Sequence, residues 1–238
     1  DFSPVEYSYL VGMAKCMRHR GPDNQNIYIK KNIGIGALLL KSTKSDKLNF
    51  PYKYGDLIAV LDGKITNDNE VWDKIELNGA KKETGHNLEL IIKSYILWGK
   101  SCFTKFEGNF SICIFDEKSQ NLIFVRDRFG SKPFFYHKTK NGIIFSSEIK
   151  GILSVGIKKS INKICIHEYL AARYTIGSDT LFNGISKIEN NSIYTIDKNK
   201  VEKERLWNFP DEFSSINQEQ IINKIDYYLN RSVKRVTS

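Results

Sequence analysis

One stretch, RDRFGSKPFFYHKTKNGIIFSSEIKGIL from Arg126 to Leu153, constrains the fold of this chain more than any other. The triplets Phe134–Tyr136 and Ile143–Phe145 are aromatic or β-branched, a composition typical of strands on a half-buried sheet. Between them, Asn141-Gly142 supplies residues that tolerate positive φ, the strongest short-range signal of a β-hairpin. The charged triplet that opens the stretch would alone indicate a solvated turn. The whole stretch predicts two strands and a helix joined by turns.

The other apolar patterns predict antiparallel hairpins with a few helices between them, which is an α+β layered fold. Strands are predicted at residues 26–29, 33–40, 57–61, 110–115, 122–125 and 192–197. Helices are predicted at residues 4–18, 68–77, 87–98, 167–173 and 215–236. Ser3–Glu6 is typical of a capping box, and Asn87 is a candidate helix cap. Asp62–Asn67 is predicted to be a turn that closes the preceding strand.

The last predicted helix has an apolar stripe that needs a partner. Ile221, Ile225 and Leu229 recur at helical spacing along it. The polar, acidic segment at 210–214 before it is the best linker candidate in the chain. We therefore expect either a docking helix or the start of another domain.

Composition excludes several classes of protein. The 238 residues are 41% hydrophobic and 12% aromatic, which is typical of a globular chain with a sizeable core. No run approaches the roughly eighteen apolar residues of a membrane span, and no secretory segment opens the chain. The net charge is +9, but the lysines are spread over loops without a basic face interleaved with aromatic residues. Nucleic-acid binding is therefore not favoured.

The cysteines and histidines show no metal-ligand spacing. The cysteines stand at positions 16, 102, 113 and 165, inside apolar patterns and without a CxxC pair. We therefore expect reduced, buried thiols in a cytoplasmic protein, and no metal site.

Several strings of this chain, in their order, resemble the glutamine amidotransferase domain of the asparagine synthetase family. They are RHRGPD at 18–23, FEGNFSICIFD at 106–116, RDRFGSKPFFY at 126–136, SSEIKGIL at 146–153 and TLFNGISKI at 180–188. Amidophosphoribosyltransferases are a related but poorer match. The resemblance implies a four-layer αββα N-terminal-nucleophile sandwich, with two antiparallel sheets flanked by helices. It also implies an amidotransferase-like domain at 1–209. Residues 210–238 would be a linker and the first helix of an absent ATP-pyrophosphatase domain, the synthetase half.

The nucleophile of that family is an amino-terminal cysteine whose own α-amino group serves as the base. The sequence begins at Asp1, and the amines of its four cysteines are peptide nitrogens. We therefore expect no catalytic nucleophile in this segment.

The resemblance also assigns five positions of the glutamine pocket. The arginine that grips the glutamine carboxylate becomes Leu39, where the alignment is weakest and the real ligands could lie elsewhere. The Asn-Gly-Glu turn, which holds the oxyanion and the substrate ammonium, becomes Asp62, Gly63 and Lys64. An aspartate that also holds the ammonium becomes Asn87. An ionised Asp62 can only accept hydrogen bonds, and Lys64 would set ammonium against ammonium. Among these roles only that of Gly63 survives.

These substitutions favour a glutaminase-inactive domain of an asparagine-synthetase-like, ATP-dependent amide-forming ligase, resembling β-lactam synthetases and lasso-peptide cyclases. The domain would be a scaffold for a synthetase half, on the same or a separate chain, that uses ATP and Mg²⁺ on a small-molecule or peptide substrate. A homodimer is left open. One alternative is a working glutamine-hydrolysing asparagine synthetase whose cysteine lies outside these residues. Another is a free-standing binding module. The sequence does not identify the substrate.

Overall fold

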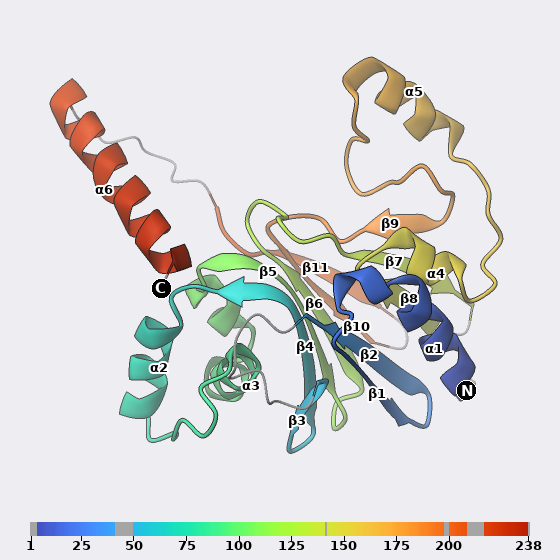
Figure 1. Cartoon of the computed structure of the whole chain (residues 1–238), viewed down its shortest axis with the longest axis horizontal. Coiled ribbons are helices and arrows are strands. Elements are labelled where there is room, and N and C mark those ends of the chain that lie inside the picture. Colours follow the sequence, from blue (N-terminus) through green and yellow to red (C-terminus); the bar gives the residue numbers. More distant parts are fainter. Residues whose placement is uncertain (1–3, 41–49, 141, 198–199, 209–216, 238) are drawn as a thin grey trace.

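The computed structural model describes residues 4–40, 50–140, 142–197, 200–208 and 217–237 (Figure 1). The helices are α1 (Tyr7–Cys16), α2 (Asp68–Leu77), α3 (Asn87–Trp98), α4 (Ile149–Leu153), α5 (Lys163–Ala172) and α6 (Gln218–Thr237), with 3-10 helices η1 (Arg18–Arg20) and η2 (Gly99–Lys105). The strands are β1 (Asn24–Lys30), β2 (Ile33–Leu39), β3 (Tyr52–Tyr54), β4 (Leu57–Ile65), β5 (Gly108–Asp116), β6 (Asn121–Arg126), β7 (Phe135–Thr139), β8 (Gly142–Ser146), β9 (Ile185–Lys187), β10 (Ser192–Ile196) and β11 (Val201–Arg205).

A six-stranded antiparallel sheet, in the order β11-β10-β6-β5-β4-β3, runs through the centre of the molecule. Strand β5 is apolar on both of its faces because both are covered by other elements. Phe110, Ile112 and Ile114 belong to the core on one face of the sheet. Cys113 and Phe115 belong to the core on the other face.

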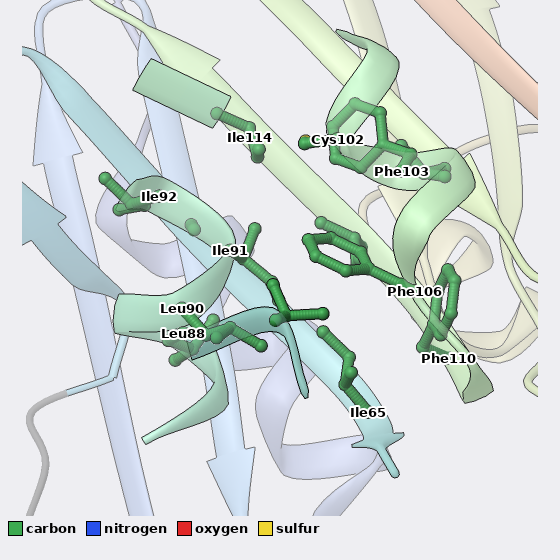
Figure 2. Close-up of a cluster of buried hydrophobic side chains, with 14 of the residues drawn as sticks. Ile65, Leu88, Leu90, Ile91, Ile92, Cys102, Phe103, Phe106, Phe110 and Ile114 are labelled. Carbon is green, nitrogen blue, oxygen red and sulfur yellow. The ribbon is translucent and has the colours of Figure 1, made fainter. Parts of the chain in front are cut away.

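The first core lies between this sheet and the elements α2, α3 and η2 (Figure 2). Trp72 of α2, Ile91 of α3 and Phe103 of η2 are all nearly inaccessible to solvent. Phe106 meets Phe103 and Phe110 edge to face, with ring centroids 6.1 and 6.3 Å apart, an arrangement that aromatic quadrupoles favour. This packing fixes β4 and β5 on the face of the sheet that α2, α3 and η2 cover.

The opposite face of the sheet packs on two smaller antiparallel sheets, β1-β2 and β8-β7-β9. Helix α1 contacts β1, β2 and α4, whereas α4 contacts β7 and β8. The layers are therefore helix, sheet, sheet and helix, and the predicted αββα sandwich is confirmed. The second sheet layer consists, in the described residues, of two separate sheets and not one.

Several predicted elements are observed with small changes in length. Strands β7 and β8 form the predicted hairpin, with Thr139 paired to Gly142, and α2 spans the predicted residues. The predicted helix at 4–18 begins only at Tyr7, with Glu6 as an N-cap residue that makes no side-chain cap. Helix α5 begins at Lys163, four residues before its predicted start, because Asn162 accepts hydrogen bonds from two backbone N–H groups of its first turn.

Two local predictions are wrong. Residues 62–65 do not form a turn but continue β4, where Asp62 pairs with Ser111 and Ile65 with Gly108. Asn87 does not cap α3, because the side chain of His86 accepts the hydrogen bond from Leu88 N–H. The linker at 210–214, Ser3 of the predicted capping box and the first two residues of the helix predicted at 215–236 lie outside the described residues. No helix in the described part has both the length and the apolar character that crossing a membrane requires.

Candidate functional site

A cavity of about 1140 Å³ lies between the six-stranded sheet, helix α1 and strands β2 and β8. Every residue of β2 and every residue of β8 lines it, so each strand presents its edge to the cavity. Among the strands of the described residues, β2 pairs with β1 and β8 with β7, and Leu39 of β2 also forms an isolated bridge with Pro22. The wall is largely apolar. One group of charged residues lies where β4, η1 and the start of α4 meet, and the cavity is also lined by Lys138, Lys140, Asp197 and Lys200.

The loop from Arg126 to Lys132 delivers one of these charged groups to the cavity. The guanidinium of Arg126 donates to the carbonyl oxygens of Lys132, Ile188 and Gly130 at 2.6 to 2.7 Å. The loop is thereby folded back on the end of β6, and Lys132 lines the cavity.

The buried side chain of Asp127 also stabilises this loop. It is 2% exposed and accepts hydrogen bonds from the backbone N–H groups of Phe110, Phe129 and Ser131. A carboxylate that accepts several N–H groups fixes a loop firmly because each bond is charge-assisted. The conspicuous RDRFGSK string is therefore a structural element of this site.

Asp62 lines the cavity and is held between two cations. Its Oδ2 is 2.5 Å from Nη2 of Arg20, and its Oδ1 is 3.8 Å from Nζ of Lys132. Asp62 and Arg20 are each about a quarter exposed, so the pair is only partly screened by water. The carboxylate that faces the cavity is therefore already neutralised by the chain itself.

Arg20 also connects Asp62 to a second carboxylate, Glu148, from which its Nη1 lies 3.4 Å. Glu148 contacts Nε2 of His19 at 2.8 Å and Nζ of Lys150 at 3.0 Å. Burial alone would raise the pKa of Glu148, but the hydrogen bonds from Lys150 and His19 outweigh it and hold the pKa below its ordinary value. The network ties together η1, β4 and the start of α4.

The five glutamine-pocket positions assigned by resemblance are not all brought together. Leu39, Asp62 and Gly63 line the cavity, whereas Lys64 and Asn87 do not. Lys64 is an exposed residue of β4, opposite Asn109. The Oδ1 atom of Asn87 accepts the backbone N–H of Ile65 at 2.8 Å and so fastens α3 to the end of β4.

Gly63 is required by the backbone at this point. Its φ is +118°, and a Cβ at this position would overlap the carbonyl group of Asn109 on β5. Only glycine adopts such a conformation at low cost. Gly63 therefore allows β4 to pair with β5 while the preceding residue, Asp62, lines the cavity.

Sequence reasoning missed four residues of this site: His19, Arg20, Lys132 and Glu148. Each of them stands in a string on which the resemblance is based. The string RHRGPD also contains three adjacent basic residues. The signal that could have found them is Asp62 itself, because a carboxylate in a cavity wall requires a cationic partner.

The cavity also contains a thiol, but not a reactive one. Cys113 lines it from β5 and is 1% exposed, and burial raises its thiol pKa. The thiolate, which is the nucleophilic form, is therefore disfavoured. No group of three His, Cys, Asp or Glu side chains in the described residues could hold a metal ion.

Comparison with curated proteins finds several asparagine synthetases among the relatives of this chain. A protein of Methanocaldococcus jannaschii, assigned as glutamine-hydrolyzing asparagine synthetase 2, is 33% identical over 93% of this chain. Glutamine-hydrolyzing asparagine synthetase 3 of Bacillus subtilis is 29% identical over 84% of it. The chain spans 48% of the first relative's length and 34% of the second's.

A solved structure supports the fold, and a family model supports the family. Glutamine phosphoribosylpyrophosphate amidotransferase of B. subtilis superposes with a TM-score of 0.64 at 13% identity, over 87% of this chain and 48% of that one. That likeness supports the fold alone. The model of the glutamine amidotransferase domain matches residues 2–207. The chain therefore belongs to the glutamine amidotransferase domain family, and within that family it is a domain of the asparagine synthetase type.

Proposed function

We propose that this domain does not hydrolyse glutamine and serves as the scaffold of an ATP-dependent, amide-forming ligase of the asparagine synthetase family. The proposal rests on one observation. The side chain of Asp62 in the cavity wall is a carboxylate, and its Oδ2 lies 2.5 Å from Nη2 of Arg20. In the family the corresponding side chain is an amide that donates to the oxyanion formed on the glutamine carbonyl.

An ionised Asp62 has no proton to donate to that oxyanion. Its negative charge would also oppose the charge that develops on the substrate. Removal of one oxyanion donor typically lowers kcat by about 10²–10³-fold. The guanidinium of Arg20 is engaged with Asp62 and Glu148.

The other substitutions act on substrate binding. Leu39 lines the cavity without a hydrogen-bond donor, so a bidentate bond to the substrate carboxylate is lost. Asn87 carries no charge for the substrate ammonium, and its carbonyl oxygen is occupied by Ile65 N–H. Lys64 supplies no carboxylate either. These losses fall on independent contacts, which is why reversal of one alone should not restore activity.

The remaining role is architectural. A synthetase half would bind ATP and Mg²⁺, activate a carboxylate of the substrate and join it to an amine, as in lactam or peptide macrolactam formation. An enzyme that draws its amine from the substrate needs no ammonia from glutamine. The amidotransferase scaffold could then persist after its pocket changed.

The test measures ammonia release from glutamine by the whole native polypeptide, with its natural amino terminus. We expect release no faster than with the heat-denatured protein. A reconstruction carrying Leu39→Arg, Asp62→Asn, Lys64→Glu and Asn87→Asp, with an amino-terminal cysteine, serves as the comparison, and circular dichroism checks that it folds. Glutamine hydrolysis by the native polypeptide that saturates with substrate would refute the proposal.

A second candidate is a working glutamine-hydrolysing asparagine synthetase. The names of the two curated relatives favour it, because both are described as glutamine-hydrolyzing. The same assay decides between the two candidates, since only the second predicts that the native polypeptide releases ammonia from glutamine.

A further inference from the structure

Arg20 and Lys132 approach the same carboxylate from different elements of the cavity wall. Nη2 of Arg20, in η1, lies 2.5 Å from Oδ2 of Asp62, and Nζ of Lys132 lies 3.8 Å from Oδ1. Each cation therefore contacts a different oxygen. Two cations that converge on the oxygens of one carboxylate are suited to binding an acidic ligand. Here the carboxylate belongs to strand β4 of the chain itself.

Both cations are also fixed by other contacts of their own. The carbonyl oxygen of Lys132 accepts hydrogen bonds from Nε of Arg126 at 2.7 Å and from Oγ of Ser111 at 3.0 Å. Nη1 of Arg20 lies 3.4 Å from Oε1 of Glu148. Removal of the carboxylate between the two cations should therefore leave them near their present positions.

The charge of the cavity favours an anion at this place. Among the described residues that line the cavity, five are lysine or arginine and three are aspartate or glutamate. The side chains of Asp62, Arg20 and Lys132 are 25, 27 and 36% exposed, so water screens their charges incompletely. Without the carboxylate of Asp62, two partly buried cations would face each other without the anion that now lies between them, which is unfavourable.

We propose that Arg20 and Lys132 form a binding site for a small carboxylate, and that Asp62 occupies this site as a ligand built into the chain. The contact is autoinhibitory, because a free acid reaches the two cations only by displacing Asp62. A tethered carboxylate competes well with a free one, since it loses no translational freedom when it binds. The native cavity should therefore bind free small acids weakly at this place.

The inference goes beyond the proposed function and does not depend on it. The proposed function concerns the hydrogen-bond donor that an oxyanion would need. The present inference concerns the cations whose site the carboxylate of Asp62 fills.

The test removes the built-in carboxylate and supplies a free one. Asp62→Ala keeps the Cβ and opens a space in which formate, the smallest carboxylate, fits. Sodium formate is titrated into the full native polypeptide at an ionic strength held constant with sodium chloride, and binding is followed by saturation-transfer difference NMR of the formate proton. We expect Asp62→Ala to bind formate at least about tenfold more tightly than the wild type does. Equal affinities would overturn the proposal.

Two matched variants define the site. Asp62→Asn fills the same space with a neutral amide and should not gain affinity for formate. Arg20→Gln combined with Asp62→Ala removes the nearer cation and should lose the gain. A gain that persists without Arg20 would place formate elsewhere and overturn the proposal. So would the absence of any gain in Asp62→Ala, the result expected if Glu148 moves to take over Arg20.

Stability supplies a second readout, which serves even where Asp62→Ala folds poorly. Formate should raise the thermal unfolding midpoint of Asp62→Ala, or restore its folding as judged by circular dichroism, at concentrations where the wild type responds no more than to sodium chloride. Equal responses of the two proteins would refute a built-in ligand.

These readouts do not depend on glutamine hydrolysis. Detection of glutaminase activity in the native polypeptide would end the proposed function and leave the formate result standing. Failure of formate to bind or to stabilise Asp62→Ala would refute the present inference alone.

Discussion

Oδ2 of Asp62 lies 2.5 Å from Nη2 of Arg20, which joins strand β4 to the 3-10 helix that follows α1. Forty-two positions separate the two residues in the sequence. On the proposed function, the residue that removes an oxyanion donor from the pocket also forms an ion pair between its walls. The proposal thus assigns a structural role to a position that has lost its catalytic one.

Replacement of Asp62 by Asn should weaken the fold slightly without restoring glutamine hydrolysis. Arg20 keeps Glu148 as a partner, and the pair is partly exposed, so we expect a loss of about 1 kcal/mol in the free energy of unfolding. Urea denaturation measures this loss, and it should shrink as salt is added. Asp73→Asn on the exposed side of α2 is the control and should change stability little. A loss in the control equal to that of Asp62→Asn would argue against the ion pair.

Much of the fold follows from local sequence patterns, because each strand and helix carries its own periodicity. The β7–β8 hairpin and α2 are examples. The pattern failed at residues 62–65, because DGKITN has the composition of a turn although β5 extends β4 through it. Turn chemistry and a strand with a glycine at positive φ look alike in a sequence.

The site is less predictable from the sequence than the fold. The resemblance located Asp62 and Gly63, but the link from Arg20 to Glu148 spans 128 positions and follows only from the packing of three layers. Asn87 illustrates the same limit. Its role at Ile65 N–H depends on how α3 meets the end of β4, which no local pattern specifies.

Gly63 should be the least replaceable residue in the wall of the cavity. A Cβ in Gly63→Ala would overlap the carbonyl of Asn109, and the φ of +118° is itself unfavourable for alanine. We expect a loss of about 3 kcal/mol or more in the free energy of unfolding. Gly12→Ala in α1 is the matched control, because nothing lies within 4 Å of its added Cβ. It should stabilise the helix by up to about 1 kcal/mol. Thermal denaturation of both variants compares them directly, and equal effects would contradict the steric argument.

Glu89 should make the fold sensitive to acid. Its side chain is fully buried and accepts hydrogen bonds from the backbone N–H groups of Glu83, Thr84 and Gly85, and Nζ of Lys93 lies 2.8 Å away. Burial alone would raise the pKa of Glu89, but these partners outweigh it and lower the pKa from 4.5 to about 2.

Because the folded-state pKa of Glu89 is depressed, its contribution to stability is complete above about pH 4.5 and disappears as the pH falls through 2. The contribution is on the order of 3 kcal/mol. Glu89→Gln should cost about as much at pH 7 and show a flatter loss of stability between pH 4.5 and 2. Urea denaturation across this range tests the expectation, with Glu76→Gln on the exposed side of α2 as the control. Parallel pH profiles for the wild type and Glu89→Gln would contradict it.

The four thiols should differ sharply in reactivity. Cys102, Cys113 and Cys165 are each at most 1% exposed, and burial raises the thiol pKa of all three. Cys16 is partly accessible at the end of α1, where its Sγ donates to the carbonyl of Met13. Because thiolate character and access together determine alkylation, iodoacetamide should modify Cys16 first in the native chain at pH 8. Mass spectrometry should find four modified cysteines only after unfolding in urea. Cys16→Ser is the control and should remove the early product. Early labelling of Cys113 would show that the cavity admits solvent to β5, and would contradict the picture of an inert thiol in its wall.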